Sequence, residues 1–252
     1  MDQFRTPVES HAHSKQTLDL LYLYDSFMDN IEVVADMGCG HGLDVEWWAS
    51  LTTRDDPPEP HNYLVYAVDR NIKNIEPDML VRNPNIKTIQ GDMSTDRIIP
   101  RQIDLMWCHD SFQYLLNPLE ALRNWNAMMN IDGMLILSIP QHQTHQYNRI
   151  HTRSYSGCYY HYNVCNLMYM LAVNGFDCRD CYVLADSNNP WLQFAVYKSA
   201  DPMDPTTTSW HDLADKNLIN DSAKLSLNTY GYVRQEDLIF TWFDRDWHFA
   251  KN

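Results

Sequence analysis

Three glycines at alternate positions are the residues of this chain best suited to holding a ligand. Gly38, Gly40 and Gly42 lie in the segment VVADMGCGHG, with the acid Asp36 just upstream. Glycine lets the backbone approach a ligand closely, and the start of a following helix offers unbonded N–H groups. The segment therefore predicts a strand-to-helix bend that binds a polar or charged group. The alternative is a bend that only turns the chain tightly.

A second candidate residue, Asp69, ends the apolar run YAVDR and is followed by Arg70, which we include in the same predicted site. A carboxylate at a strand end is suited to accept hydrogen bonds from both hydroxyls of a ribose. Asp69 follows Gly42 by 69 − 42 = 27 residues, whereas a dinucleotide fold uses roughly 20. The polar, proline-rich insertion at 52–61 accounts for the excess.

The glycine spacing distinguishes two classes of cofactor. A dinucleotide fold holds its pyrophosphate with G-x-G-x-x-G, a pattern that this loop lacks. The chain instead resembles the class I, Rossmann-like S-adenosylmethionine-dependent methyltransferases, whose first motif is an acid followed by x-Gly-x-Gly-x-Gly. The resemblance implies that the loop, including Cys39, surrounds the methionine moiety of S-adenosylmethionine. It implies that Asp36 or the nearby backbone holds the amino group, that Asp92 of IQGDMST accepts from the adenine amine, and that Met93 packs near the ring.

The resemblance extends from about residue 33 to 199 and favours the small-molecule methyltransferase group. The segments IDLMWCHDSFQYLLNPLEAL and NIDGMLILSIP resemble the fourth and fifth strand regions of that group. The Asn/Asp-Pro-Pro-aromatic signature of enzymes that methylate amino groups of bases and glutamine does not occur at the corresponding site, which reads Cys108-His109-Asp110-Ser111. We therefore predict methyl transfer to a small-molecule acceptor.

His109 is the first candidate for a catalytic residue. Methyl transfer from a sulfonium is an in-line displacement, so positioning and exclusion of water supply much of the acceleration. A general base is needed only when the acceptor loses a proton. His109 is expected at the carboxyl end of the fourth strand and titrates near neutrality. It is predicted either to act as this base or to serve a backbone or cofactor-packing role.

The polar loop PQHQTHQYNR follows the predicted fifth strand, where open α/β sheets bind substrates. His142 and His145 are predicted to contact the acceptor, and Arg149 is predicted to pair with a carboxylate or phosphate on it. The alternative is a hydrated loop.

The scaffold that must position these residues is predicted from short, continuous apolar runs at 32–37, 63–68, 86–90, 103–108 and 134–139. Such runs are typical of strands covered on both faces. Two further strands at 176–184 and 191–197 are expected to pair in antiparallel fashion, and Asn117-Pro118 with Glu120 is a helix start. The fold class is therefore α/β, a doubly wound, mostly parallel seven-stranded sheet with one reversed edge strand.

The chain is expected to divide into three segments. Residues 1–30 form a helical segment, with a helix at 14–28 that packs on the core or over a pocket mouth as a lid. Residues 31–199 form the Rossmann-like core. Residues 200–252, rich in aromatic side chains, are expected to fold onto the core, cover the site or form a contact between copies in a homo-oligomer.

Composition limits the partners. The 252-residue chain has 19 Lys+Arg against 33 Asp+Glu, a formal net charge of −14, which disfavours nucleic acid and anionic membranes. Because no signal peptide or apolar run of membrane-spanning length is found, we predict a cytoplasmic protein whose six cysteines remain thiols. Cys178 and Cys181 lie within an apparent strand, where they should point to opposite faces, so no metal site is predicted.

Two other functions stay open. A catalytically silent S-adenosylmethionine-binding subunit would explain the aromatic C-terminal segment and the lack of a clear base. A nicotinamide-dependent oxidoreductase is disfavoured by the glycine spacing.

Overall fold

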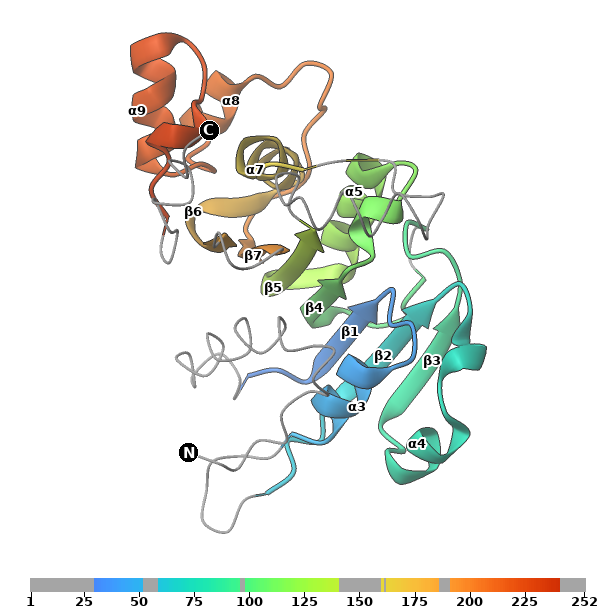
Figure 1. Cartoon of the computed structure of the whole chain (residues 1–252). Coiled ribbons are helices and arrows are strands. Elements are labelled where there is room, and N and C mark those ends of the chain that lie inside the picture. The colour runs from blue at the N-terminus through green and yellow to red at the C-terminus, as the bar shows by residue number, and fades with distance from the viewer. Residues whose placement is uncertain are drawn as a thin grey trace.

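The computed structural model of the chain describes residues 30–51, 59–95, 98–140, 160, 162–185 and 191–240, and the predicted helix at 14–28 lies outside these ranges. A single seven-stranded sheet runs through the described part (Figure 1). Its strands are β1 (Val33–Met37), β2 (Leu64–Asp69), β3 (Ile86–Gln90), β4 (Ile103–His109), β5 (Met129–Pro140), β6 (Phe176–Ala185) and β7 (Trp191–Lys198).

The strands lie in the order β3-β2-β1-β4-β5-β7-β6. The first five strands in this order, β3 to β5, are parallel to one another, while β7 lies between β5 and β6 and runs antiparallel to both. The predicted fold class is therefore confirmed. The order reverses direction at β1, which lies between β2 and β4, and in doubly wound sheets ligands bind at the carboxyl ends of the strands around such a point.

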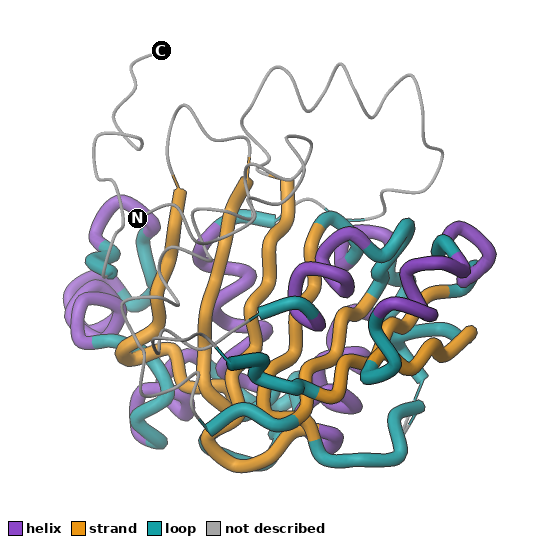
Figure 2. Tube along the Cα trace, turned by 90° about the horizontal axis from the view of Figure 1, so that it is seen from below, coloured by secondary structure: helices purple, strands orange, loops and turns teal. Residues whose placement is uncertain are grey.

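Helices cover both faces of this sheet (Figures 1 and 2). The helices α3 (Leu43–Ala49) and α4 (Pro77–Arg82) contribute to one apolar core with alternate residues of the central strands. The helices α5 (Pro118–Met128) and α7 (Val164–Val173) pack on the other face and form the larger core. Both faces of the central strands are buried, which is why their sequences are continuous apolar runs.

The start of α5 has the predicted cap. The Asn117 side-chain oxygen accepts from the backbone N–H of Glu120 at 3.3 Å, and its Nδ2 donates to the Glu120 carboxylate at 2.8 Å. Pro118 occupies the first turn, where its missing N–H costs nothing. At the other end of this helix, the Lys198 ammonium of β7 donates to the carbonyls of Asn126 and Met129 at 2.7 and 2.9 Å.

Residues 200–240 fold against the outer end of the sheet. They contain α8 (Trp210–Asp215), α9 (Asp221–Tyr230) and the short 3-10 helix η4 (Gln235–Asp237). The backbone N–H of Cys178 in β6 donates to the Leu218 carbonyl at 2.9 Å, and the Tyr169 hydroxyl of α7 donates to the Thr208 carbonyl at 2.6 Å. The division of the chain into three segments stays a prediction.

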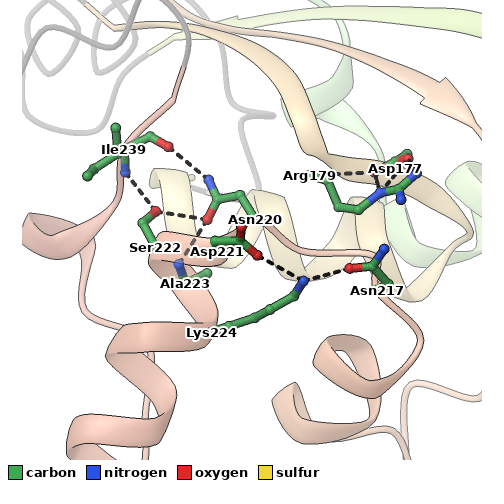
Figure 3. Close-up of polar contacts among 9 residues, drawn as sticks. All are labelled: Asp177, Arg179, Asn217, Asn220, Asp221, Ser222, Ala223, Lys224 and Ile239. Carbon is green, nitrogen blue, oxygen red and sulfur yellow. Dashed lines mark hydrogen bonds and ion pairs between the residues drawn. The ribbon is translucent and has the colours of Figure 1, made fainter.

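Asn220 organises the start of α9 (Figure 3). Its side-chain oxygen accepts from Ala223 N and from the Ser222 hydroxyl, both at 2.9 Å, while its Nδ2 donates to the Ile239 carbonyl at 3.1 Å. One buried amide therefore caps the helix and joins it to the segment after η4.

The expectation that Cys178 and Cys181 point to opposite faces is wrong. The pairing of β6 with β7 shifts register between Asp177 and Tyr182, and both cysteines are buried in the same apolar core. An irregularity of this kind interrupts the alternation of side chains along a strand. The Cys181 thiol donates to the Cys178 carbonyl at 3.4 Å.

Candidate cofactor and active site

The glycine bend joins β1 to α3 at the predicted position. Gly38, Gly40 and Gly42 all have positive φ, at 86°, 53° and 80°. The N–H groups of Gly38 and Cys39 both donate to the Val68 carbonyl at the end of β2, at 2.8 and 3.1 Å. Non-glycine residues rarely adopt such φ values, so the alternating glycines allow the chain to turn closely over the strand ends.

Gly38 has a second reason to lack a side chain. The Ser111 hydroxyl, in the loop after β4, donates to the Gly38 carbonyl at 2.9 Å. A Cβ atom at Gly38 would lie 2.3 Å from Ser111 Oγ and 2.4 Å from its Cβ. At Gly40, in contrast, a Cβ would meet no atom of the described residues within 4 Å. The bend and the β4 loop are therefore in direct contact at Gly38.

Asp69 lies beside the same bend. Its Oδ2 accepts from the backbone N–H of Gly40 at 3.0 Å, and its Oδ1 accepts from Asn71 N at 2.8 Å. Asp69 lies at the end of β2, as predicted, and its carboxylate also orders the loop that follows the first strand.

Asp92 follows β3 at the same edge of the sheet. One carboxylate oxygen accepts from Ser94 N and Ser94 Oγ at 2.9 and 2.7 Å, while the other pairs with the Arg70 guanidinium at 2.6 Å. Partial burial alone would raise the pKa of Asp92, but the bonds from Ser94 and the charge of Arg70 outweigh it and hold that pKa below its ordinary value. The carboxylate is therefore ionised near neutrality.

A group of carboxylates lies beneath the bend. Asp36, in β1, is 3% exposed, and burial raises its pKa well above the ordinary range, with further increases from the nearby charges of Asp44 and Asp69. Asp44, in the first turn of α3, is also buried and accepts from the Trp107 indole N–H at 3.0 Å. Like charges held together in a desolvated place favour a bound cation.

The carboxyl ends of β1, β2, β3 and β4 surround one cavity of about 140 Å³. Its lining residues are Gly38, Asp69, Arg70, Gly91, Met93, Ser111, Tyr114 and Leu115. Four of the predicted cofactor-site residues therefore meet in one place. The structure adds Gly91, Ser111, Tyr114 and Leu115; only the position of the last three, directly after the strand that ends at His109, was a signal for them in the sequence.

Cys39 lies within the bend, but its thiol is poorly suited to chemistry. The side chain is 9% exposed, and burial, followed by the charges of Asp36 and Asp69, raises the pKa of the thiol strongly. A protonated, buried thiol is inert.

His109 lies at the carboxyl end of β4, as predicted, and is half-buried. Its ring is nearly parallel to that of Trp107, at 12° and 6.4 Å between centroids, on the face of the sheet covered by α3. Its carbonyl accepts from the Ser111 hydroxyl at 3.1 Å. The predicted acceptor contacts His142, His145 and Arg149 lie outside the described residues.

The sheet order and the glycine bend define a Rossmann-like α/β fold with a cavity at the carboxyl ends of its strands. Residues 35–137 match the family model described as a methyltransferase domain. This match and the Rossmann-like sheet confirm the resemblance to class I S-adenosylmethionine-dependent methyltransferases. The comparison with proteins of curated function gives no match.

Solved structures share the fold at low sequence identity. An O-methyltransferase family protein from Burkholderia thailandensis superposes with a TM-score of 0.55 at 9% identity, covering 75% of this chain and 58% of that chain. Magnesium protoporphyrin IX methyltransferase from Synechocystis PCC 6803, with bound S-adenosylhomocysteine, gives 0.52 at 14% identity over 75% and 84%. An S-adenosylmethionine-dependent methyltransferase from Clostridium acetobutylicum gives 0.51 at 14% identity over 76% and 98%.

No helix in the described ranges combines the length and the apolar character that a membrane crossing requires.

Proposed function

We propose that this protein is a methyltransferase that binds S-adenosylmethionine at the glycine bend and transfers its methyl group to a small-molecule acceptor. The observation that carries the proposal is the group of three acids Asp36, Asp44 and Asp69: the first two are buried and the third lines the strand-end cavity. S-adenosylmethionine, when bound, supplies an electrophilic methyl group on a sulfonium and carries an ammonium. The cationic end of such a ligand matches this charge.

The remaining cavity residues suit the nucleoside end. Asp69 is available to accept from ribose hydroxyls, and Met93 and Leu115 offer apolar surface for an adenine ring. In this arrangement the chain positions the cofactor and excludes water, and both effects lower the barrier of a displacement reaction.

The same carboxylates disfavour the nicotinamide alternative. Burial and the charges of Asp44 and Asp69 already disfavour ionisation of Asp36, and a pyrophosphate placed at this bend would add further negative charge to the same desolvated place. The absence of the G-x-G-x-x-G spacing acts in the same direction.

Calorimetry tests the cofactor. S-adenosylmethionine and S-adenosylhomocysteine should bind with dissociation constants on the order of micromolar, whereas NADH and NADPH should not bind at comparable concentrations. Binding of NADH in preference to S-adenosylmethionine would contradict the proposal.

Transfer of a labelled methyl group separates an enzyme from a silent subunit. The protein would be incubated with methyl-labelled S-adenosylmethionine and a panel of alcohols, phenols, amines, carboxylates and thiols. An enzyme releases S-adenosylhomocysteine in step with labelled product. Tight cofactor binding with no label transferred to any acceptor class would support the silent-subunit alternative.

A further inference from the structure

Two unfavourable features occur three residues apart at the carboxyl end of β4. Asp110 has φ of 51°, a left-handed backbone that non-glycine residues rarely adopt. Gln113 is 1% exposed, and its Nε2 donates to Asp110 Oδ1 at 2.6 Å. Among the described residues, no group donates a hydrogen bond to the buried Gln113 Oε1.

Neither feature helps the fold. A left-handed aspartate and a buried acceptor without a donor both cost stability, and such costs persist mainly where a site requires them. The short bond from Gln113 holds the Asp110 carboxylate in one orientation, since hydrogen bonds to charged acceptors are strong and directional. The two features together therefore fix where this carboxylate points.

The position of this pair places it at the site. Asp110 N donates to the Ser138 carbonyl at 2.9 Å, so the pair lies where β4 and β5 end side by side. The residues around it in the chain, Ser111 and Tyr114, line the strand-end cavity. Asp110 is half-buried and so partly accessible to a ligand, whereas Gln113 is buried.

An apolar surface adjoins the pair. Leu115 lines the cavity, and the next residue, Leu116, is 68% exposed. Tyr160 is 41% exposed, and its hydroxyl donates to the backbone carbonyl of Leu116 at 2.9 Å. This bond keeps Tyr160 beside Leu116. Exposed apolar groups beside a binding cavity are suited to an apolar ligand.

We propose that the acceptor is a hydroxyl group carried on an apolar ring or chain, that Asp110 is the catalytic residue that takes its proton, and that Gln113 is the positioning residue that orients Asp110. The inference rests on the proposed function. In the step, the acceptor oxygen bonds to the methyl carbon while the carbon–sulfur bond breaks and its electron pair stays on sulfur. The hydroxyl proton passes to the Asp110 carboxylate and then to solvent.

The proposed base is therefore Asp110 and not the preceding residue, His109. The His109 ring packs along Trp107 on the α3 face, whereas the Asp110 carboxylate is held by η3 (Phe112–Tyr114), the segment that borders the cavity. A base has to lie within hydrogen-bond reach of the proton that it removes.

The test uses phenol and anisole as probes on protein saturated with S-adenosylhomocysteine. Both share one ring, but only phenol has a proton to donate. The carbon-13 signal of the Asp110 carboxyl, assigned by its loss in Asp110→Asn, is followed by NMR during each titration. Phenol should shift this signal and bind at least about tenfold more tightly than anisole, as one hydrogen bond to a charged group implies.

Matched variants separate a functional from a structural role. Asp110→Asn keeps the size and tolerates the left-handed backbone, and it should abolish the preference for phenol. Gln113→Leu should reduce the preference and leave the affinity for S-adenosylhomocysteine within about twofold, since it removes no predicted cofactor contact. Asp132→Asn changes another left-handed aspartate, φ 62°, at the far end of the sheet and should change neither.

The outcomes are distinct. If phenol affects the Asp110 signal no more than anisole, or if the preference survives Asp110→Asn, the assignment of Asp110 is wrong. If S-adenosylhomocysteine does not bind the wild-type protein, the proposed function fails instead. With an acceptor from the labelling panel, the acid limb of the wild-type pH–rate profile should disappear in Asp110→Asn, with a rate loss on the order of 100-fold or more.

Discussion

The Gly40 amide donates to Asp69 Oδ2 across 3.0 Å, so the glycine bend after β1 and the end of β2 are joined by a direct bond. The shape of the bend therefore depends on a residue that also lines the strand-end cavity.

Asp36→Asn should stabilise the protein while weakening its ligand. Because the folded pKa of Asp36 is raised, its ionised form destabilises the fold, and this cost appears as pH rises through the folded pKa. Asparagine removes the cost, so the melting temperature at neutral pH should rise by about 2–4 °C. At pH values below the ordinary carboxyl pKa of about 3.9 the gain should vanish, since the wild-type carboxyl is then protonated in both states.

In calorimetry, Asp36→Asn should lower the affinity for S-adenosylmethionine by about tenfold, the loss expected for a bond to a charged group. Asp132→Asn is the matched control, because it changes an exposed aspartate near the amino end of β5, away from the carboxyl ends of the strands. A variant with lower melting temperature and unchanged affinity would show that Asp36 is a structural residue.

Gly38→Ala should be far more damaging than Gly40→Ala. At Gly40 a new Cβ contacts none of the described residues, so the positive φ sets a cost of about 1–2 kcal/mol. At Gly38 the same backbone cost is joined by a clash with Ser111, so unfolding by urea should show a loss of about 3 kcal/mol or more.

Second-site changes identify the clash. Because a Gly38 Cβ meets Ser111 Cβ at 2.4 Å, Ser111→Ala should not rescue Gly38→Ala, whereas Ser111→Gly should recover part of the stability. Equal damage from the two glycine substitutions would remove the steric argument.

Asp69→Ala and Asp69→Asn should differ in stability and agree in binding. Alanine leaves the N–H groups of Gly40 and Asn71 without their acceptor, at a cost of about 1–3 kcal/mol, whereas asparagine retains one oxygen. Both should reduce the affinity for S-adenosylhomocysteine by tenfold or more if the carboxylate accepts from the ribose. Urea unfolding and calorimetry measure the two effects, and full affinity in Asp69→Asn would exclude the carboxylate from the site.

Lys198→Met should destabilise the fold without affecting the cofactor. The buried ammonium donates to the carbonyls of Asn126 and Met129, and its loss leaves both without this donor. We expect a cost of about 1–3 kcal/mol in urea unfolding. Lys87→Met is the control, since this exposed lysine on β3 donates to the Pro84 carbonyl at 3.1 Å and is not buried against α5 or β5. Equal stability of the two variants would mean that the carbonyls of Asn126 and Met129 find other hydrogen-bond donors when Lys198 is replaced.

Local patterns predicted most of the scaffold because local chemistry produces it. The apolar runs became strands within one or two residues for most of the sheet, and Asn117-Pro118 with Glu120 starts α5 as expected. Strand β5 begins earlier than predicted, at Met129, because it pairs with Ile103 through a register shift before its apolar part. A strand's start thus depends on its neighbour as well as on its own residues.

What the sequence alone determined about this protein is the alternating-glycine bend, the acids that end its strands and the order of its elements, since each depends on residues close together in the chain. Only the tertiary structure decided that Ser111 lies against Gly38, 73 residues away. The same holds for the raised pKa of Asp36 beside Asp44 and Asp69, and for the buried Gln113 oxygen, which accepts from no group among the described residues. These properties arise from burial and from the meeting of distant segments, which local spacing does not encode.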